Sequence, residues 1–158
     1  MQTGQPARVV GGHAGRALRE TAGSAILPAK TIGTAGEQFF AYRALEEGLH
    51  VAQPLGDNLP YDLLVDSGQE ILRLQIKTTT TEVAGKPGKY GFALNHGKDS
   101  SSYHADTVDF FGLVVLPLRT IYIVPQESVD ERIKVYVYPE NPDSAGLLER
   151  YCENWGLL

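Results

Sequence analysis

The segment at residues 61–77, with the sequence YDLLVDSGQEILRLQIK, constrains the fold of this chain more than any other. Apolar residues alternate along its two arms, which is the period of a β-strand with one buried face. The residues between the arms, 67–70, make a hairpin loop of ordinary length. We therefore predict a hairpin whose register cannot slip without exposing its apolar face. The expected pairs are Asp66 with Ile71, Val65 with Leu72, Leu63 with Leu74, and Tyr61 with Ile76.

The same register brings three polar groups together on the other face of the hairpin. Asp62 is expected opposite Gln75, and Lys77 follows two residues later on the same side. A hard divalent cation such as Mg²⁺ prefers oxygen ligands and retains several waters. Asp62, Gln75 and the backbone carbonyl of Ile76 would supply such oxygens. Lys77 would position or deprotonate a water and offset phosphate charge, a set of roles that suits metal-assisted phosphodiester hydrolysis.

A helix is predicted upstream, at residues 34–47, and it contributes a further acid. Thr34 and Glu37 fit a capping box, and Gly48 marks the end of the helix. The apolar stripe consists of Phe40, Ala41, Ala44 and Leu45. Glu37 lies one turn before this stripe and on the same face, so it is either a cap alone or a second acid beside Asp62. The nearby Asp62 and Lys77 favour a metal ligand.

These residues together resemble the PD-(D/E)XK nuclease superfamily. The resemblance comprises Glu37 on a helix, Asp62 preceded by Pro60-Tyr61, and Gln75-Ile76-Lys77, and it covers residues 33–125. It implies an α/β (α+β) fold, restriction-endonuclease-like, with a central mixed β-sheet flanked by helices. It also implies that Glu37 and Asp62 are metal ligands and that Lys77 is the catalytic lysine. Archaeal-type Holliday-junction resolvases and the PD-(D/E)XK homing endonucleases of group I introns look most similar.

The sequence departs from the family pattern in two places. Pro60 lies two residues before the aspartate instead of next to it, and Gln75 stands where the family has an acid. A neutral ligand lowers the negative charge of the site by one. We expect weaker cation affinity, and one of two metals could be lost.

The rest of the chain predicts one nuclease domain at residues 31–158 behind a flexible basic arm at residues 1–30. The arm has four basic residues against Glu20 alone, although the whole chain has a net charge of −5. A last helix is expected from about residue 143 to about 155. Further strands are expected at residues 50–52, 90–94, 108–116, 120–124 and 133–138.

DNA binding requires a locally basic surface and not a basic total. The candidates for contacts with DNA are Arg43, Arg73, Lys86, Lys89, Lys98 and Tyr103. The longest apolar run, residues 110–116, is too short to span a bilayer, and no signal segment begins the chain. A soluble, cytoplasmic protein is expected. The single cysteine excludes an intrachain disulfide and a cysteine-rich metal site.

Three functional classes fit these residues. The first is a structure-selective endonuclease such as a Holliday-junction resolvase, which uses Mg²⁺, with Mn²⁺ able to substitute. The second is a sequence-specific endonuclease of the homing or restriction type, and the third is a nuclease fold that binds DNA without cutting it. One small domain favours the first class, because reading a long target needs many base contacts. Paired cuts in branched or duplex DNA predict a homodimer or a higher symmetric homo-oligomer.

Overall fold

The computed structural model describes residues 27–158, with the exception of 57, 97–100, 103–106, 131, 142 and 144–145. Residues 1–26 of the predicted arm and the candidates Lys98 and Tyr103 lie outside the described residues. No helix in the part of the chain that the structure describes is long and apolar enough to cross a membrane.

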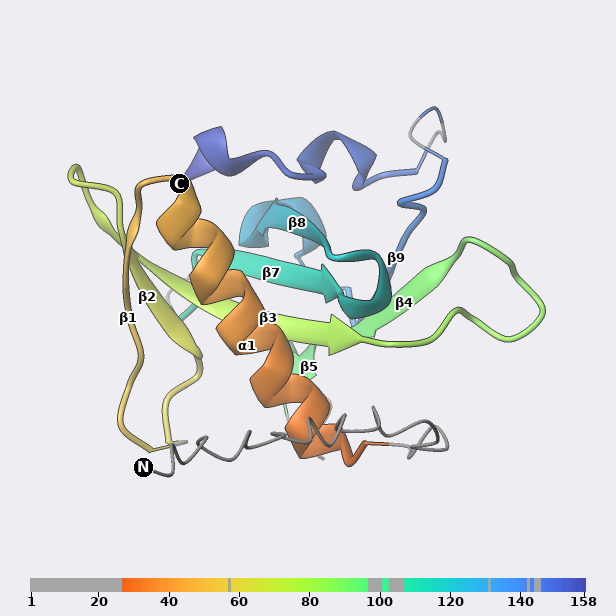
Figure 1. Ribbon diagram of the computed structural model, residues 1–158, viewed down its shortest axis with the longest axis horizontal. Coiled ribbons are helices and arrows are strands. Elements are labelled where there is room, and N and C mark those ends of the chain that lie inside the picture. Colours follow the sequence, from red (N-terminus) through yellow and green to blue (C-terminus); the bar gives the residue numbers. More distant parts are fainter. Residues whose placement is uncertain are drawn as a thin grey trace, which may run out of the picture.

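A five-stranded mixed sheet with the order β1-β2-β3-β7-β8 forms the centre of the fold (Figure 1). Its strands are β1 (His50–Ala52), β2 (Leu63–Asp66), β3 (Ile71–Thr79), β7 (Phe110–Val115) and β8 (Thr120–Pro125). Strands β3 and β7 pair in parallel, and the other neighbours in this sheet are antiparallel. Two smaller ladders join β4 (Tyr90–Ala93) to β9 (Lys134–Val137), and β5 (Asn95–His96) to β6 (Ser101–Ser102).

The predicted hairpin is formed by β2 and β3, and three of its four expected pairs are confirmed. Leu63 pairs with Leu74, Val65 with Leu72, and Asp66 with Ile71. Leu63, Val65, Leu72 and Leu74 are buried, so alternation correctly identified the core-facing side of both strands. The ladder ends at Leu63, however, and the expected pair of Tyr61 with Ile76 does not form.

Helix α1 (Ala29–Glu46) begins five residues earlier than predicted. Pro28 is its N-cap residue, with φ of −56°, and the carbonyl of Pro28 accepts the N–H of Ile32 at 3.1 Å. Thr34 therefore lies within the helix, and the predicted capping box is wrong. The predicted end is confirmed, because Gly48 adopts a φ of 82° just after the last turn. Glu37 consequently lies in mid-helix, where it cannot serve as a cap.

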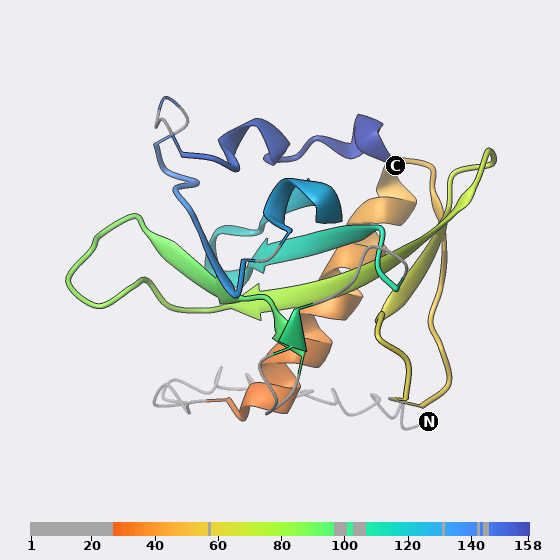
Figure 2. The same cartoon turned by 180° about the vertical axis from the view of Figure 1, so that it is seen from behind.

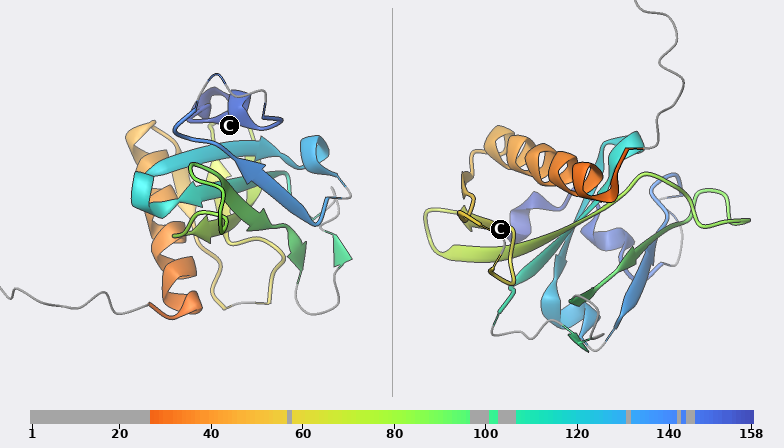
Figure 3. Two further views of the ribbon diagram at one scale, coloured as in Figure 1. Left: turned by 90° about the vertical axis from the view of Figure 1, so that its right-hand side faces the viewer. Right: turned by 90° about the horizontal axis from the view of Figure 1, so that it is seen from below.

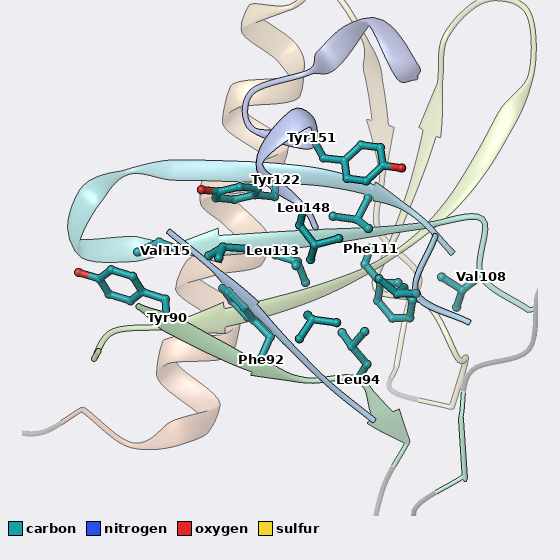
Figure 4. Packing of buried hydrophobic residues seen from close by; sticks show 14 residues of the cluster. Tyr90, Phe92, Leu94, Val108, Phe111, Leu113, Val115, Tyr122, Leu148 and Tyr151 are labelled. Carbon is teal, nitrogen blue, oxygen red and sulfur yellow. The ribbon is translucent and has the colours of Figure 1, made fainter. Parts of the chain in front are cut away.

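Helix α1 covers one face of the sheet and the β4–β9 pair covers the other, while the C-terminal segment runs along the β8 edge (Figures 2 and 3). Phe40 and Ala44 of α1 pack into the first core. Gly112 of β7 makes this approach possible, because a Cβ there would lie 2.7 Å from the Phe40 ring. The second core lies under β4 and β9 and includes Phe92, whose ring points inward (Figure 4).

The predicted last helix is wrong, because the C-terminal segment forms only short 3-10 turns, at Glu149–Tyr151 and Trp155–Leu157. Two glutamates bind to strands instead of supporting a helix. Glu149 accepts the hydroxyl of Tyr122 at 2.8 Å, and Glu153 accepts the backbone N–H of Ile121 at 2.8 Å. The segment thereby covers the outer edge of β8, which would otherwise expose unpaired backbone groups. Two further 3-10 turns span Leu116–Leu118 and Gln126–Val129.

Candidate active site

The site is centred on Asp62, the residue just before the chain enters the hairpin ladder at Leu63. The Asp62 N–H donates to the carbonyl of Leu74 at 2.8 Å, although Leu74 is the ladder partner of Leu63. One carboxylate oxygen of Asp62, Oδ2, accepts the backbone N–H of Ile76 at 2.7 Å and the side-chain amide of Gln75 at 2.5 Å. The predicted ladder pair of Asp62 with Gln75 is therefore replaced by contacts of the Asp62 side chain.

This arrangement follows from the unequal lengths of two strands. Strand β2 begins only at Leu63, opposite Leu74, whereas β3 continues past Leu74 to Thr79 and pairs there with β7. One edge of β3 is thus left without a strand partner beyond Leu74, and the Asp62 carboxylate binds to this edge. The N–H and C=O of one strand residue point to the same side of the strand. The Ile76 carbonyl therefore faces the edge that Asp62 occupies.

Helix α1 brings Glu37 to the same edge of β3 from the face of the sheet that the helix covers. Gly36 allows the helix to approach β3 very closely, because a Cβ at that position would lie 1.8 Å from Oγ1 of Thr78. Burial, and then the negative charge of Asp62, raise the pKa of Glu37 above its usual range. The carboxylates of Glu37 and Asp62 are thus close enough to repel each other.

The pKa of Asp62 is also raised, chiefly by burial. Hydrogen bonds from Ile76 and Gln75 and the charge of Lys77 act in the opposite direction. For Lys77 itself, burial lowers the pKa, and the charge of Asp62 partly opposes the effect. Asp62 is therefore electrostatically coupled both to Glu37 on the helix and to Lys77 on β3.

Gln53 is a site residue that the sequence did not reveal. It follows β1, and its side-chain amide donates to Oε2 of Glu37 at 3.3 Å. Its own carbonyl oxygen accepts the side-chain amide of Gln38 at 3.1 Å. The loop at residues 53–60 has the composition of a simple connection. No local pattern distinguishes Gln53, because its partner lies 16 residues away on another element.

A cavity of about 460 Å³ opens beside the two carboxylates. Its lining includes Lys30, Glu37, Gln53, Tyr61 and Asp62. This volume is several times that of a water molecule, whose share of the liquid is about 30 Å³. A hydrated cation and part of a larger substrate therefore fit beside Glu37 and Asp62.

The chemistry of the donors fits a hard divalent cation better than a soft one. The charge of Asp62 raises the pKa of the half-buried Glu37, and a cation bound beside both carboxylates would relieve this repulsion. Nowhere in the described residues do three His, Cys, Asp or Glu side chains gather in a metal-binding group, so neutral oxygens would have to complete the ligand set. Gln75 now points its amide nitrogen at Asp62. Rotation of this carboxamide by about 180° would present its oxygen instead.

The predicted DNA contacts separate into two groups. Arg43 forms ion pairs with three glutamates of the helix end and the C-terminal segment, including one to Glu153 at 3.2 Å. Arg73 binds Asp109 through two nitrogens, at 2.7 and 3.0 Å. The charges of both arginines are thus balanced by carboxylates. Lys86 and Lys89 lie on the loop between β3 and β4, which projects beyond the rest of the described chain (Figure 1).

The sequence of this chain also matches a known protein family. The family model for PD-(D/E)XK endonucleases matches residues 27–146 of this chain. The chain belongs to this family. No curated protein sequence gives a significant match.

Solved structures of PD-(D/E)XK proteins are similar as well. The bacterial homing endonuclease I-Ssp6803I is 26% identical, with a TM-score of 0.67 over 82% of this chain and 90% of the other. The Holliday junction resolvase Hjc of Archaeoglobus fulgidus is 13% identical, with a TM-score of 0.45 over 68% of this chain and 84% of the other. The family match and the similarity to I-Ssp6803I confirm the predicted restriction-endonuclease-like α+β fold. The chain is thus a member of a nuclease family.

Proposed function

We propose that this protein is a Mg²⁺-dependent DNA endonuclease that hydrolyses phosphodiester bonds. The observation that carries the proposal is the position of the Asp62 carboxylate. It lies at the open edge of β3, bonded to Gln75 and the Ile76 N–H and coupled electrostatically to Glu37 and Lys77. Mn²⁺ has similar ligand preferences and is expected to substitute.

Glu37, Asp62, the carboxamide oxygen of Gln75 and the carbonyl of Ile76 would hold the ion. A divalent ion bound to these groups supplies positive charge that stabilises the transition state of phosphodiester hydrolysis. Gln53 supports this set, because its hydrogen bond fixes one oxygen of Glu37. Such supporting partners orient ligands and commonly affect metal affinity.

Lys77 is proposed as the residue that handles the proton of the attacking water. Burial lowers the pKa of its ammonium, which increases the fraction that is neutral and basic near pH 7. The neutral amine accepts one proton as the water oxygen bonds to phosphorus. One P–O ester bond breaks, and the leaving oxygen takes a proton from solvent. In its charged form, the same side chain offsets the negative charge of the phosphate.

A sequence-specific endonuclease acting on duplex DNA is the finer role that we propose. It is supported by the similarity to the homing endonuclease over 90% of that chain. Gln75 in place of an acid is a second feature in which the sequence resembles the homing type. The sequence on its own favoured a Holliday-junction resolvase, because one small domain recognises DNA shape more easily than it reads many bases. Junction cleavage is therefore the second candidate.

Either role requires paired active sites for paired cuts, so we propose a symmetric homodimer or higher homo-oligomer. The large aromatic residues of β7 and the C-terminal segment are used in the core and not for such an interface. Phe111, Tyr151 and Trp155 are buried, and Phe110 packs against the cluster under α1. The interface must use other residues.

The decisive assay compares a four-way junction, its component duplexes and plasmid DNA, each with Mg²⁺. Discrete plasmid fragments would support the sequence-specific enzyme, and cutting of the junction alone would support the resolvase. Binding without cutting would refute the nuclease proposal. Lys77→Ala should abolish cleavage while DNA binding and folding persist. Gln75→Glu should tighten Mg²⁺ binding, and an unchanged Mg²⁺ titration would exclude Gln75 as a ligand.

A further inference from the structure

The β4–β9 ladder has an outer face with an unusual composition. Tyr90 and Phe92 of β4 and Val135 and Val137 of β9 are buried in the second core. By alternation, the intervening residues point outward. The register places Gly91 opposite Tyr136 and Ala93 opposite Lys134. We call this surface, together with the flanking residues, the lysine–tyrosine face: Lys89, Gly91, Ala93, Lys134, Tyr136 and Tyr138.

Tyr136 organises the charges on the lysine–tyrosine face. The Nζ atom of Lys89 lies 3.9 Å from the centroid of its ring, and Nζ of Lys134 lies 5.5 Å from the same centroid. The two ammonium groups are therefore at most 9.4 Å apart, the sum of these distances. The ring lies across Gly91, where an added Cβ would come within 3.2 Å of it. A larger residue at this position would displace the ring.

An aromatic ring fixes an ammonium group without cancelling its charge, unlike a carboxylate. Across the described ranges, no Asp or Glu oxygen lies within the 4.0 Å of an ion pair from Lys86, Lys89, Arg132 or Lys134. Two acids lie at the neighbouring Gly88: Glu82 accepts its N–H at 2.8 Å, and Glu140 lies next to it. Lys89 and Lys134 are thus oriented by a ring and form no close ion pair with a described residue.

A groove of about 270 Å³ continues this surface past Arg132, Tyr136 and Tyr138 to Leu147. None of the residues of this groove lines the cavity beside Glu37 and Asp62. The groove and the cavity beside Asp62 are therefore separate surfaces. Only a long ligand could contact the lysine–tyrosine face and the active site at the same time.

We propose that the lysine–tyrosine face is a second DNA-contact surface, which binds backbone phosphates of a duplex away from the cut bond. This inference rests on the proposed function, since DNA is the long polyanion that both sites would share. Lys89 and Lys134 contact phosphates, and Tyr136 holds both side chains in place. Basic residues clustered on one face are the electrostatic footprint of a nucleic-acid-binding surface. The face affects affinity and footprint, and it leaves the chemical step unaltered.

The test measures binding without cutting, by fluorescence anisotropy of a labelled long duplex in metal-free buffer over a range of salt concentrations. Each phosphate contact contributes about 0.9 to the slope of log affinity against log salt. The double variant Lys89→Gln/Lys134→Gln should therefore lower the slope by about 1.8. A short duplex that covers only the active site should bind both proteins equally.

The matched control is Arg119→Gln/Arg150→Gln, which also removes two positive charges. Arg150 lies over a tyrosine too, with Cζ 5.1 Å from the Tyr151 centroid, but on the C-terminal segment. This control should retain the wild-type slope. Tyr136→Phe should keep wild-type affinity, and Tyr136→Leu should weaken it. An equal loss of slope in the control, or an unchanged slope in the lysine variant, would overturn the proposal.

Failure of the nuclease proposal is recognised separately. If the wild-type protein binds the long duplex but does not cut it with Mg²⁺, the proposed function fails, and the lysine–tyrosine face is still tested by the salt slopes. If the wild-type protein does not bind duplex DNA at any salt concentration, the face proposal is wrong as well.

Discussion

The contact between Gly36 and Thr78 determines how close helix α1 brings Glu37 to Asp62. A methyl group added at Gly36 would lie 1.8 Å from Oγ1 of Thr78 and 2.8 Å from its Cβ and Cγ2. Gly36→Ala is therefore expected to push α1 away from β3. Because Glu37 is the next residue on the helix, its carboxylate would move with it.

The size of the displacement follows from these distances. Ordinary contacts begin at 3.4 Å, so the existing rotamer of Thr78 leaves a deficit of 1.6 Å. Rotation of the Thr78 side chain removes the clash with Oγ1 but not that with Cβ, whose deficit is 0.6 Å. Catalytic groups must be held within about 0.5 Å, and a misplacement of about 1 Å can cost a factor of roughly 100. We expect a loss of cleavage of between about tenfold and a hundredfold.

Stability should change less than activity. Overpacking of a core contact costs about 1–3 kcal/mol, and replacement of a helical glycine by alanine returns about 0.5–1 kcal/mol. Gly33→Ala isolates the gain from replacing a helical glycine, since nothing lies within 4 Å of a Cβ at that position. This variant should raise the free energy of unfolding. Urea unfolding measures both variants.

The assays are single-turnover cleavage and direct Mn²⁺ binding to the folded protein. Adding Thr78→Ala to Gly36→Ala removes the shortest clash and should restore part of the Mn²⁺ affinity. The hydroxyl that this change deletes is buried and bonds to no described residue, so its loss costs little. Wild-type cleavage and Mn²⁺ affinity in Gly36→Ala would refute the reasoning that this contact positions Glu37.

Three further outcomes are expected. Burial and Asp62 raise the pKa of Glu37. The metal-free protein should therefore lose stability as pH rises through that pKa. Glu37→Gln should be more stable than the wild type at pH 7 while binding Mn²⁺ more weakly. Equal melting temperatures at pH 7 would contradict this prediction. Gln53→Ala should weaken Mn²⁺ binding by about tenfold or more, whereas Gln38→Ala, which spares the bond from Gln53 to Glu37, should not; equal effects would remove Gln53 from the site. Deletion of residues 1–26, which carry three arginines and one glutamate, should weaken DNA binding most at low salt, and unaltered binding there would leave these residues without this function.

Local pattern was sufficient for the hairpin and for the family. Alternation with period 2 is a property of consecutive residues, so the register of β2 against β3 and its buried side were readable from the chain. The same register placed Asp62, Gln75 and Lys77 near one another. A buried strand such as β7 was equally clear, because its apolar run is continuous.

The predicted last helix and the arginines Arg43 and Arg73 show what local pattern lacks. Glu153 bonds to Ile121, 32 residues earlier, and Arg43 pairs with Glu153 across 110 residues. These partners meet only when the C-terminal segment closes over β8. A charged side chain in sequence cannot reveal whether a distant carboxylate neutralises it.

The sequence by itself determined the family, and it predicted Glu37, Asp62, Gln75 and Lys77 as the residues for catalysis. Only the tertiary structure decided how these groups meet. Strand β2 stops before β3 does, and the free edge places Asp62 where Glu37 reaches it from the helix and Gln53 fixes Glu37 in turn. The physical reason is that periodicity reports the side of a strand on which a residue lies, whereas the end of a ladder and the closeness of a helix depend on packing between distant segments.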